Sequence, residues 1–196
     1  LPTRYYPVEF PVKMKSKSDF GFSGNETLYL CPQSAIKHHP DLDVIFGAIL
    51  QGDKNAVIAV VEGAVADWTN QVQERWRQTI PDVMARITVV PRQSPEDFIA
   101  LQNAADVILD TPHFSGGNTS FEAFALGKPI VTLDGEFMRG RVTAGMYRMM
   151  GIDGCIATSL DGYIEIALKF GLDQDHRAEM SSRILEANNV LFNDKT

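Results

Sequence analysis

Short hydrophobic runs alternate along this chain with stretches in which hydrophobic residues recur every three or four positions. Five of the runs are too short for a helix and are rich in Val, Ile and Leu, so each is predicted to be a buried strand. These are Thr27–Cys31, Ala56–Val61, Ile87–Val90, Val107–Leu109 and Ile130–Leu133. A sixth, shorter strand is predicted at Cys155–Ala157.

The stretches between these runs have the period of helices. A hydrophobic face or a stripe at helical spacing, or a capping pattern, predicts helices at Asp41–Leu50, Asp67–Thr79, after Ser94, around Phe121–Leu126, and at Met138–Met150, Tyr163–Phe170 and His176–Asn188. Strand and helix alternate throughout, which is typical of an α/β fold with a parallel sheet. We expect a Rossmann-like open sheet of about six parallel strands with helices on both faces.

One loop stands out between the strands Val107–Leu109 and Ile130–Leu133. Its sequence is Ser-Gly-Gly-Asn-Thr-Ser (residues 115–120), and it runs directly into a helix. Gly116 and Gly117 allow the backbone to come close to a ligand, and free N–H groups at a helix start bind anions such as phosphate. The polar side chains that accompany them are Asn118, Thr119 and Ser120.

The same residues have a second interpretation that needs no ligand. Thr119 and Glu122 have the spacing of a capping box, in which the two side chains cap the helix start reciprocally. Alternatively, Glu122 lies where a carboxylate could accept hydrogen bonds from ribose hydroxyls. The pattern alone leaves both interpretations open.

Composition sets the broad class of protein. The chain has 196 residues, of which 44% are hydrophobic and 22% charged, as in an ordinary globular protein. The net charge of −7 disfavours a nucleic-acid-binding domain, which is more often basic. We expect residues 1–25 to be a linker or N-terminal arm with solvated lysines, and residues 26–196 to form one nucleotide-binding lobe.

Several classes of site and location are disfavoured. There are only two cysteines and no metal-binding spacing, which predicts no metal site and a cytoplasmic protein with reduced thiols. No apolar run approaches the ~20 residues of a membrane span, so no membrane association is expected. His38 and His39 are interpreted as a polar loop, with metal binding as the lesser alternative. Neither a P-loop nor a G-x-G-x-x-G fingerprint is present.

Three segments together resemble a known family. They are CPQSAIKHHPD from Cys31, the stretch from Pro91 through the glycine loop to Leu133, and GEFMRGRV from Gly135. In this order they are similar to the C-terminal catalytic lobe of O-linked N-acetylglucosamine transferases, and in particular to bacterial, tetratricopeptide-linked members of glycosyltransferase family forty-one. The resemblance implies the C-terminal lobe of a two-lobed GT-B glycosyltransferase.

The resemblance also implies roles for residues that hold the donor's phosphates and ribose. Lys37 matches the family lysine that neutralises the donor's diphosphate and stabilises the leaving group. Asn118 and Thr119 match the pair at the helix start that holds the phosphates, and Glu122 matches the acidic residue on the ribose. No metal ion or bound cofactor is implied; the small-molecule partner is a nucleotide sugar.

Other positions correspond to contacts with the base, and some depart from the family. Gln33 lies near the family's amide residue, with a spacing to the lysine that differs by one. Gln93 falls where a backbone group contacts the base, and Phe98 replaces a histidine that animal members place against the base. Pro95 and Leu101 stand where basic side chains occur in animal members.

The resemblance therefore implies sugar transfer, with N-acetylglucosamine moved from UDP-N-acetylglucosamine to a protein Ser or Thr. The acceptor protein, an N-terminal lobe and tetratricopeptide repeats would be the partners. Two alternatives remain: a nucleotide-sugar epimerase on the same fold, and a non-catalytic nucleotide-binding or docking module. His113, in the glycine loop, is the nearest candidate for a base, although the base is expected in the other lobe.

Overall fold

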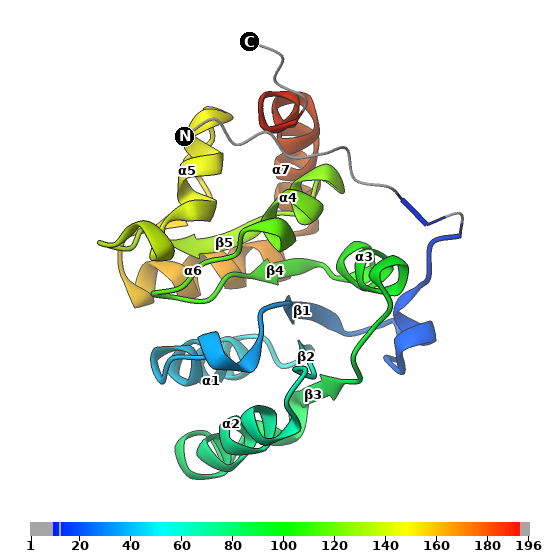
Figure 1. The fold of residues 1–196 in the computed structure, drawn as a ribbon, viewed down its shortest axis with the longest axis vertical. Helices are drawn as coiled ribbons and strands as arrows, with labels where there is room; N and C mark the ends of the chain where they lie inside the picture. Colours follow the sequence, from blue (N-terminus) through cyan, green and yellow to red (C-terminus); the bar gives the residue numbers. More distant parts are fainter. Residues whose placement is uncertain (1–9, 12, 193–196) are drawn as a thin grey trace.

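The computed structural model describes residues 10–11 and 13–192 and shows one six-stranded parallel sheet. The strands are β1 (Thr27–Cys31), β2 (Ala56–Val61), β3 (Ile87–Val90), β4 (Val107–Leu109), β5 (Ile130–Leu133) and β6 (Ile156–Ala157). Their order across the sheet is β3-β2-β1-β4-β5-β6 (Figure 1). This is the Rossmann order, and it confirms the predicted fold class.

The described chain has seven α-helices and several short 3-10 turns; the first five helices lie between strands, and the last two follow the last strand. The helices are α1 (Asp41–Gly52), α2 (Ala66–Thr79), α3 (Pro95–Ala104), α4 (Asn118–Ala125), α5 (Val142–Met149), α6 (Leu160–Leu172) and α7 (Gln174–Ala187). Crossovers between parallel strands are right-handed, so α1 and α2 cover one face and α3 and α4 the other. Helix α6 returns to pack against α1, and α3 packs against α4.

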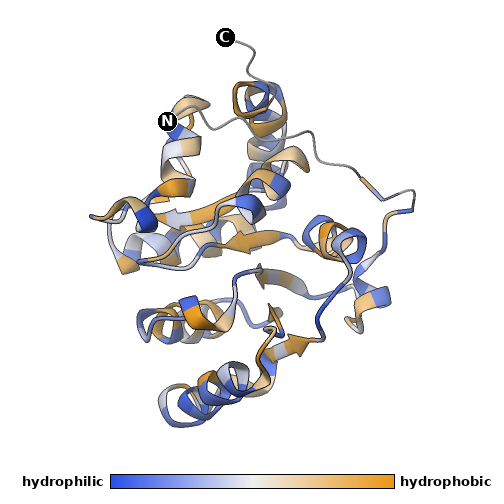
Figure 2. Cartoon of the chain, in the orientation of Figure 1, coloured by the Kyte–Doolittle hydropathy of each residue, from blue (hydrophilic) through white to orange (hydrophobic). Residues whose placement is uncertain are grey.

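The core lies along the sheet, as the hydrophobic runs predicted. Leu28 to Cys31 of β1 are completely buried, and so are Val107 and Leu109 of β4. The predicted apolar face of α1 is buried as well, because Leu42, Ile45, Phe46 and Ile49 cover the sheet. Figure 2 shows hydrophobic strands inside and hydrophilic residues on the outer sides of the helices. No helix of the described chain combines the length and apolar character that crossing a membrane requires.

The N-terminal segment differs from the predicted solvated arm. Residues 1–9 and 12 lie outside the described residues, but Lys17–Phe20 form a 3-10 turn and Phe22 is buried. Lys17 pairs with Asp106 at the start of β4, with Nζ and Oδ2 2.5 Å apart. The expectation of solvated lysines was wrong for Lys17, because an acidic partner distant in sequence comes beside it.

The helix predicted at Met138–Met150 is interrupted. Residues Met138–Gly140 form a 3-10 turn, and the α-helix begins only at Val142. The carbonyl of Arg139 accepts hydrogen bonds from the N–H and the hydroxyl of Ser115, at 2.7 and 3.2 Å. The 3-10 turn thus bonds to the glycine loop after β4, which explains why a regular helix does not run through Met138–Gly140.

Candidate functional site

Two loops meet at the carboxyl edge of the sheet, where the strand order reverses. β1 and β4 are neighbours, but the chain leaves β1 toward β2 and leaves β4 toward β5. In open α/β sheets the loops that follow two such strands border the crevice in which ligands bind. Most of the predicted phosphate-binding residues lie in these two loops or in the first helical turn that follows each loop.

Lys37 connects the two loops. Its Nζ donates hydrogen bonds to Oε1 of Gln33, at 2.9 Å, and to the backbone carbonyl of Ser115, at 3.1 Å. It also lies over the ring of Phe114, 4.6 Å from the centroid. Burial lowers the pKa of this half-buried amine, while the carboxylate of Asp110 opposes that shift. A cation in this position would be available to a diphosphate in the crevice.

Gln33 extends this network to the helix start. The side chain is buried, and its Nε2 donates to Oγ1 of Thr119 at 2.6 Å. Lys37, Gln33 and Thr119 thus form one hydrogen-bonded chain from the loop after β1 to the first turn of α4. The structure thus brings Gln33 and Lys37 beside Thr119, which is 86 positions from Gln33 in the sequence.

The two glycines of the loop differ in the space around them. A Cβ on Gly116 would lie only 2.4 Å from Oγ of Ser120 and 2.7 Å from Nε2 of Gln33, so close packing requires glycine there. A Cβ on Gly117 would meet nothing within 4 Å, so the space beside it is open. The N–H groups of Asn118 and Thr119 begin α4, where a helix has no internal acceptors for them. Gly117 and this helix start are where an anion could approach.

Ser120 is less accessible than the sequence suggested. Its hydroxyl is buried and lies 2.8 Å from Oγ1 of Thr143, and its N–H donates to the carbonyl of Gly117 at 3.0 Å. The bond to Thr143 joins α4 to α5. A role for Ser120 at the phosphates stays a prediction.

A buried acid that we did not single out from the sequence organises the glycine loop. Asp110 follows β4 directly, and its Oδ1 accepts from the N–H of Gly116 at 2.7 Å. Its Oδ2 accepts from the hydroxyl of Thr132 at 2.8 Å. Burial raises the pKa of this carboxyl, and these hydrogen bonds counteract the shift. An acidic residue immediately after a fully buried strand was the available signal.

The capping box does not form. The N-cap of α4 is Gly117, which has no side chain to cap with. The hydroxyl of Thr119 accepts from Gln33 instead, and Oε2 of Glu122 accepts from Nε2 of Gln102 at 3.0 Å. Of the two interpretations, the structural one is therefore wrong. Ribose binding by Glu122 stays a prediction.

Replacing Glu122 with Gln should separate binding from stability. Burial raises the pKa of the Glu122 carboxyl, and Oε1 of Gln102 is buried without a hydrogen-bond partner. A glutamine could accept from the Gln102 amide and also donate to this oxygen, so we expect an unchanged or slightly higher melting temperature. Loss of a charged hydrogen bond to ribose should weaken UDP binding about tenfold. Calorimetry and thermal melts measure the two effects. A much lower melting temperature with unchanged UDP affinity would show that Glu122 is structural.

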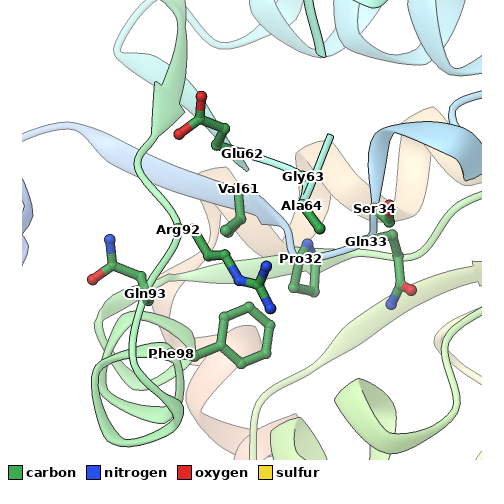
Figure 3. Close-up of a pocket in the computed structure, with 10 residues that line it drawn as sticks. All are labelled: Pro32, Gln33, Ser34, Val61, Glu62, Gly63, Ala64, Arg92, Gln93 and Phe98. Carbon is green, nitrogen blue, oxygen red and sulfur yellow. The ribbon is translucent and has the colours of Figure 1, made fainter. Parts of the chain in front are cut away.

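A cavity of about 300 Å³ opens beside the crevice, beyond the ends of β1, β2 and β3. Ten residues line it: Pro32, Gln33, Ser34, Val61, Glu62, Gly63, Ala64, Arg92, Gln93 and Phe98 (Figure 3). Figure 3 shows the side chains of Arg92 and Phe98 together, while that of Gln93 turns away. The predicted base-contacting residues therefore do line one cavity, and Gln33 adjoins it from the loop after β1. Arg92, just before Gln93, was missed from the sequence.

The two departures noted near Phe98 have structural reasons. Leu101 is completely buried in the core, so a side chain at this position of α3 cannot face the cavity. Pro95 is the first residue of α3, and Ser94 caps the helix by accepting from the N–H of Asp97. Neither residue supplies a polar group to the cavity.

The loop after β1 depends on a buried histidine, which contradicts the prediction of a polar loop at His38. The side chain of His38 is buried, and its Nε2 lies 3.1 Å from the carbonyl of Gln33. Burial lowers its pKa from 6.5 to about 4. The neutral imidazole thus helps to hold Gln33 in place.

This burial predicts a pH-dependent stability. The folded pKa of His38 lies below the unfolded one, so the unfolded chain takes up the proton first as the pH falls from about 6.5 toward 4. The free energy of unfolding should therefore fall by about 1.4 kcal/mol between pH 7.5 and 5.5 because of His38. Urea titrations should show a smaller loss for His38→Gln, which keeps an N–H donor but does not titrate. Equal losses in both proteins would contradict this account.

Comparison with known proteins agrees with this geometry. Residues 8–196 match the model of the family described as glycosyl transferase family 41. The chain belongs to this family. One similar relative is the UDP-N-acetylglucosamine–peptide N-acetylglucosaminyltransferase of Caenorhabditis elegans, 30% identical over 113 residues, which are 57% of this chain and 10% of the relative.

A second relative and two solved structures are also similar. The probable transferase SEC of Arabidopsis thaliana is 26% identical over 84% of this chain and 17% of its own length. The fold superposes on a mutant O-GlcNAc transferase of Thermobaculum terrenum with a TM-score of 0.82 and 23% identity, over 98% of this chain and 36% of that one. Anabaena HepE, solved with UDP and glucose, gives 0.67 and 15% over 87% and 45%. This chain thus spans 10% and 17% of the length of the two relatives, and less than half of either solved structure.

Proposed function

We propose that this chain is the nucleotide-sugar-binding lobe of an enzyme that moves N-acetylglucosamine from UDP-N-acetylglucosamine to Ser or Thr of a protein. The observation that carries the proposal is the position of Lys37. Its Nζ lies at the switch point of the sheet, bonded to both loops of the crevice. Membership in family 41 and the names of the relatives support the donor and the acceptor.

The chemistry needs charge stabilisation at the leaving group. When the bond from the sugar to the diphosphate breaks, negative charge develops on the diphosphate oxygens. Lys37 would neutralise it, and the N–H groups of Asn118 and Thr119 would donate to it from the start of α4. Both are held in place before any ligand binds, by Gln33 and Asp110. These groups can supply the charge stabilisation without a metal ion.

The neighbouring cavity would take the base and Glu122 the ribose. Phe98 could stack on the base, and the side chain of Gln93 turns away so that its backbone can face the base. Arg92 would add a cationic donor. The cavity of about 300 Å³ has room for a pyrimidine base, and Anabaena HepE was solved with UDP and glucose.

The rest of the enzyme is also part of the proposal. The acceptor site and the general base would lie on an N-terminal lobe, and tetratricopeptide repeats would be linked to it. The crevice between the loops after β1 and β4 would face that lobe. A cytoplasmic location stays a prediction from the cysteine content.

Titration of nucleotides tests the proposal. We expect calorimetry to show that UDP binds more tightly than GDP, and that UDP-N-acetylglucosamine binds in competition with UDP. Binding of neither nucleotide, or equal binding of GDP, would overturn the assignment of the donor. Epimerisation of the sugar in the absence of any acceptor would favour the isomerase alternative instead.

A further inference from the structure

Two histidines and an aspartate come together beside the crevice. His39 and Asp41 lie at the start of α1, and His113 lies in the loop after β4. Nε2 of His113 is 2.7 Å from Oδ2 of Asp41, and Nδ1 of His39 is 3.4 Å from the same oxygen. The two imidazole rings meet edge to face with centroids 4.4 Å apart. The three side chains therefore converge on one point from two separate segments.

The donor atoms have the spacing of a metal site. One ligand atom from each residue lies within 4.8 Å of both others. An ion bound tetrahedrally at about 2.0 to 2.1 Å from each atom needs ligand atoms roughly 3.3 Å apart, so small rotations of these side chains suffice. Two imidazoles and a carboxylate with open positions are a donor set that suits zinc and other divalent transition metals.

One of the two nitrogens is already in a form that can bind a metal, and the other, Nε2 of His113, would lose to solvent the proton with which it bonds Asp41. Nδ1 of His39 accepts a hydrogen bond from the N–H of Asp41 at 3.2 Å, so it carries a lone pair and no proton. An ion would replace this long bond, and the freed N–H belongs to the first turn of α1, where water can satisfy it. The side chains are 50%, 34% and 48% exposed for His39, Asp41 and His113, which leaves an entry path and free coordination positions.

The backbone at His113 supports a specific role for this side chain. Its φ of 68° lies in the left-handed region, and no other described residue except glycine has a positive φ. Such a conformation is uncommon for a residue with a side chain and concentrates at functional sites. The loop has this conformation at the residue whose imidazole contacts Asp41.

We propose that His39, Asp41 and His113 bind one divalent transition-metal ion, with Zn²⁺ as the best match. In the ion-free state the hydrogen bond between His113 and Asp41 holds the same geometry. The ion would tie the glycine loop after β4 to the start of α1, two residues beyond Lys37. The site is distinct from the diphosphate site, where Lys37 supplies the positive charge, and it does not depend on the donor's identity.

Calorimetry with Zn²⁺ on the tag-free chain tests this proposal. We expect saturable binding of one ion per chain, a higher melting temperature with Zn²⁺, and no comparable binding of Mg²⁺, which prefers oxygen ligands. His39→Ala and His113→Asn should each weaken Zn²⁺ binding at least about tenfold. Asparagine is chosen at position 113 because it tolerates the left-handed backbone.

The matched control is His176→Ala, which removes a histidine from α7 that stacks on Phe170 and belongs to no such cluster. It should bind Zn²⁺ as the parent does. Melting without metal shows whether each variant is folded, and Asp41→Asn provides a third ligand variant if one fails. The proposal is overturned if the parent binds no Zn²⁺ with a stoichiometry of one, or if binding survives both His39→Ala and His113→Asn unchanged.

Discussion

Incubated with labelled UDP-N-acetylglucosamine and a Ser-containing peptide, this chain alone should bind the nucleotide and leave the peptide unmodified. The groups proposed for base, ribose and phosphates all lie between Gln33 and Glu122, so the nucleotide half of the donor has its partners here. His113 is the nearest candidate for a general base, but its imidazole is already bonded to Asp41. A general base has to come within about 3 Å of the acceptor proton or reach it through one water.

A single lobe also leaves the crevice open to solvent. Closure of two lobes over the donor would exclude water and strengthen every electrostatic contact with the diphosphate. We therefore expect measurable but weak UDP binding by calorimetry, and no transfer above the level of a reaction without protein. Restoring transfer by adding the proposed N-terminal lobe would complete the test. Robust glycosylation by this chain alone that His113→Ala abolishes would refute this expectation.

Replacing Lys37 with Ala should weaken UDP binding far more than uridine binding. The amine is the side-chain cation that bridges the two loops of the crevice, and its contacts are with Gln33 and the Ser115 carbonyl rather than with an acid. A hydrogen bond to a charged group contributes about 1.5–3 kcal/mol, which corresponds to a loss of roughly tenfold to a hundredfold in affinity for UDP. Uridine lacks the diphosphate and should lose little.

The control for this variant is Lys54→Ala, because Lys54 is exposed on the turn between α1 and β2, away from the crevice. It removes the same charge from the molecule and should leave both affinities unchanged. Thermal melts must accompany the titrations, since Lys37 also joins two loops of the folded chain. If Lys37→Ala lowers the affinities for uridine and UDP equally, the assignment of Lys37 to the diphosphate is wrong.

Hydrophobic periodicity was sufficient for the fold. Five strands were predicted with the bounds they have, and α1 buries the face that the sequence indicated. Buried parallel strands carry apolar residues on both faces, and amphipathic helices repeat every 3.6 residues, so both signals are local. The helix expected at Met138–Met150 is interrupted because the carbonyl of Arg139 accepts a hydrogen bond from Ser115, which is distant in the sequence.

The candidate site also has features that the sequence determined and contacts that only the tertiary structure decided. The sequence by itself determined the strand–loop–helix unit that carries Gly116 to Glu122, because glycines before a helix start and apolar strands on either side are local features. Only the tertiary structure decided that Thr119 bonds to Gln33, that Glu122 bonds to Gln102, and that His113 meets Asp41. These pairs lie between 20 and 86 positions apart along the chain. A side chain's choice between a local cap and a distant partner depends on which strands become neighbours, and that is settled only when the sheet assembles.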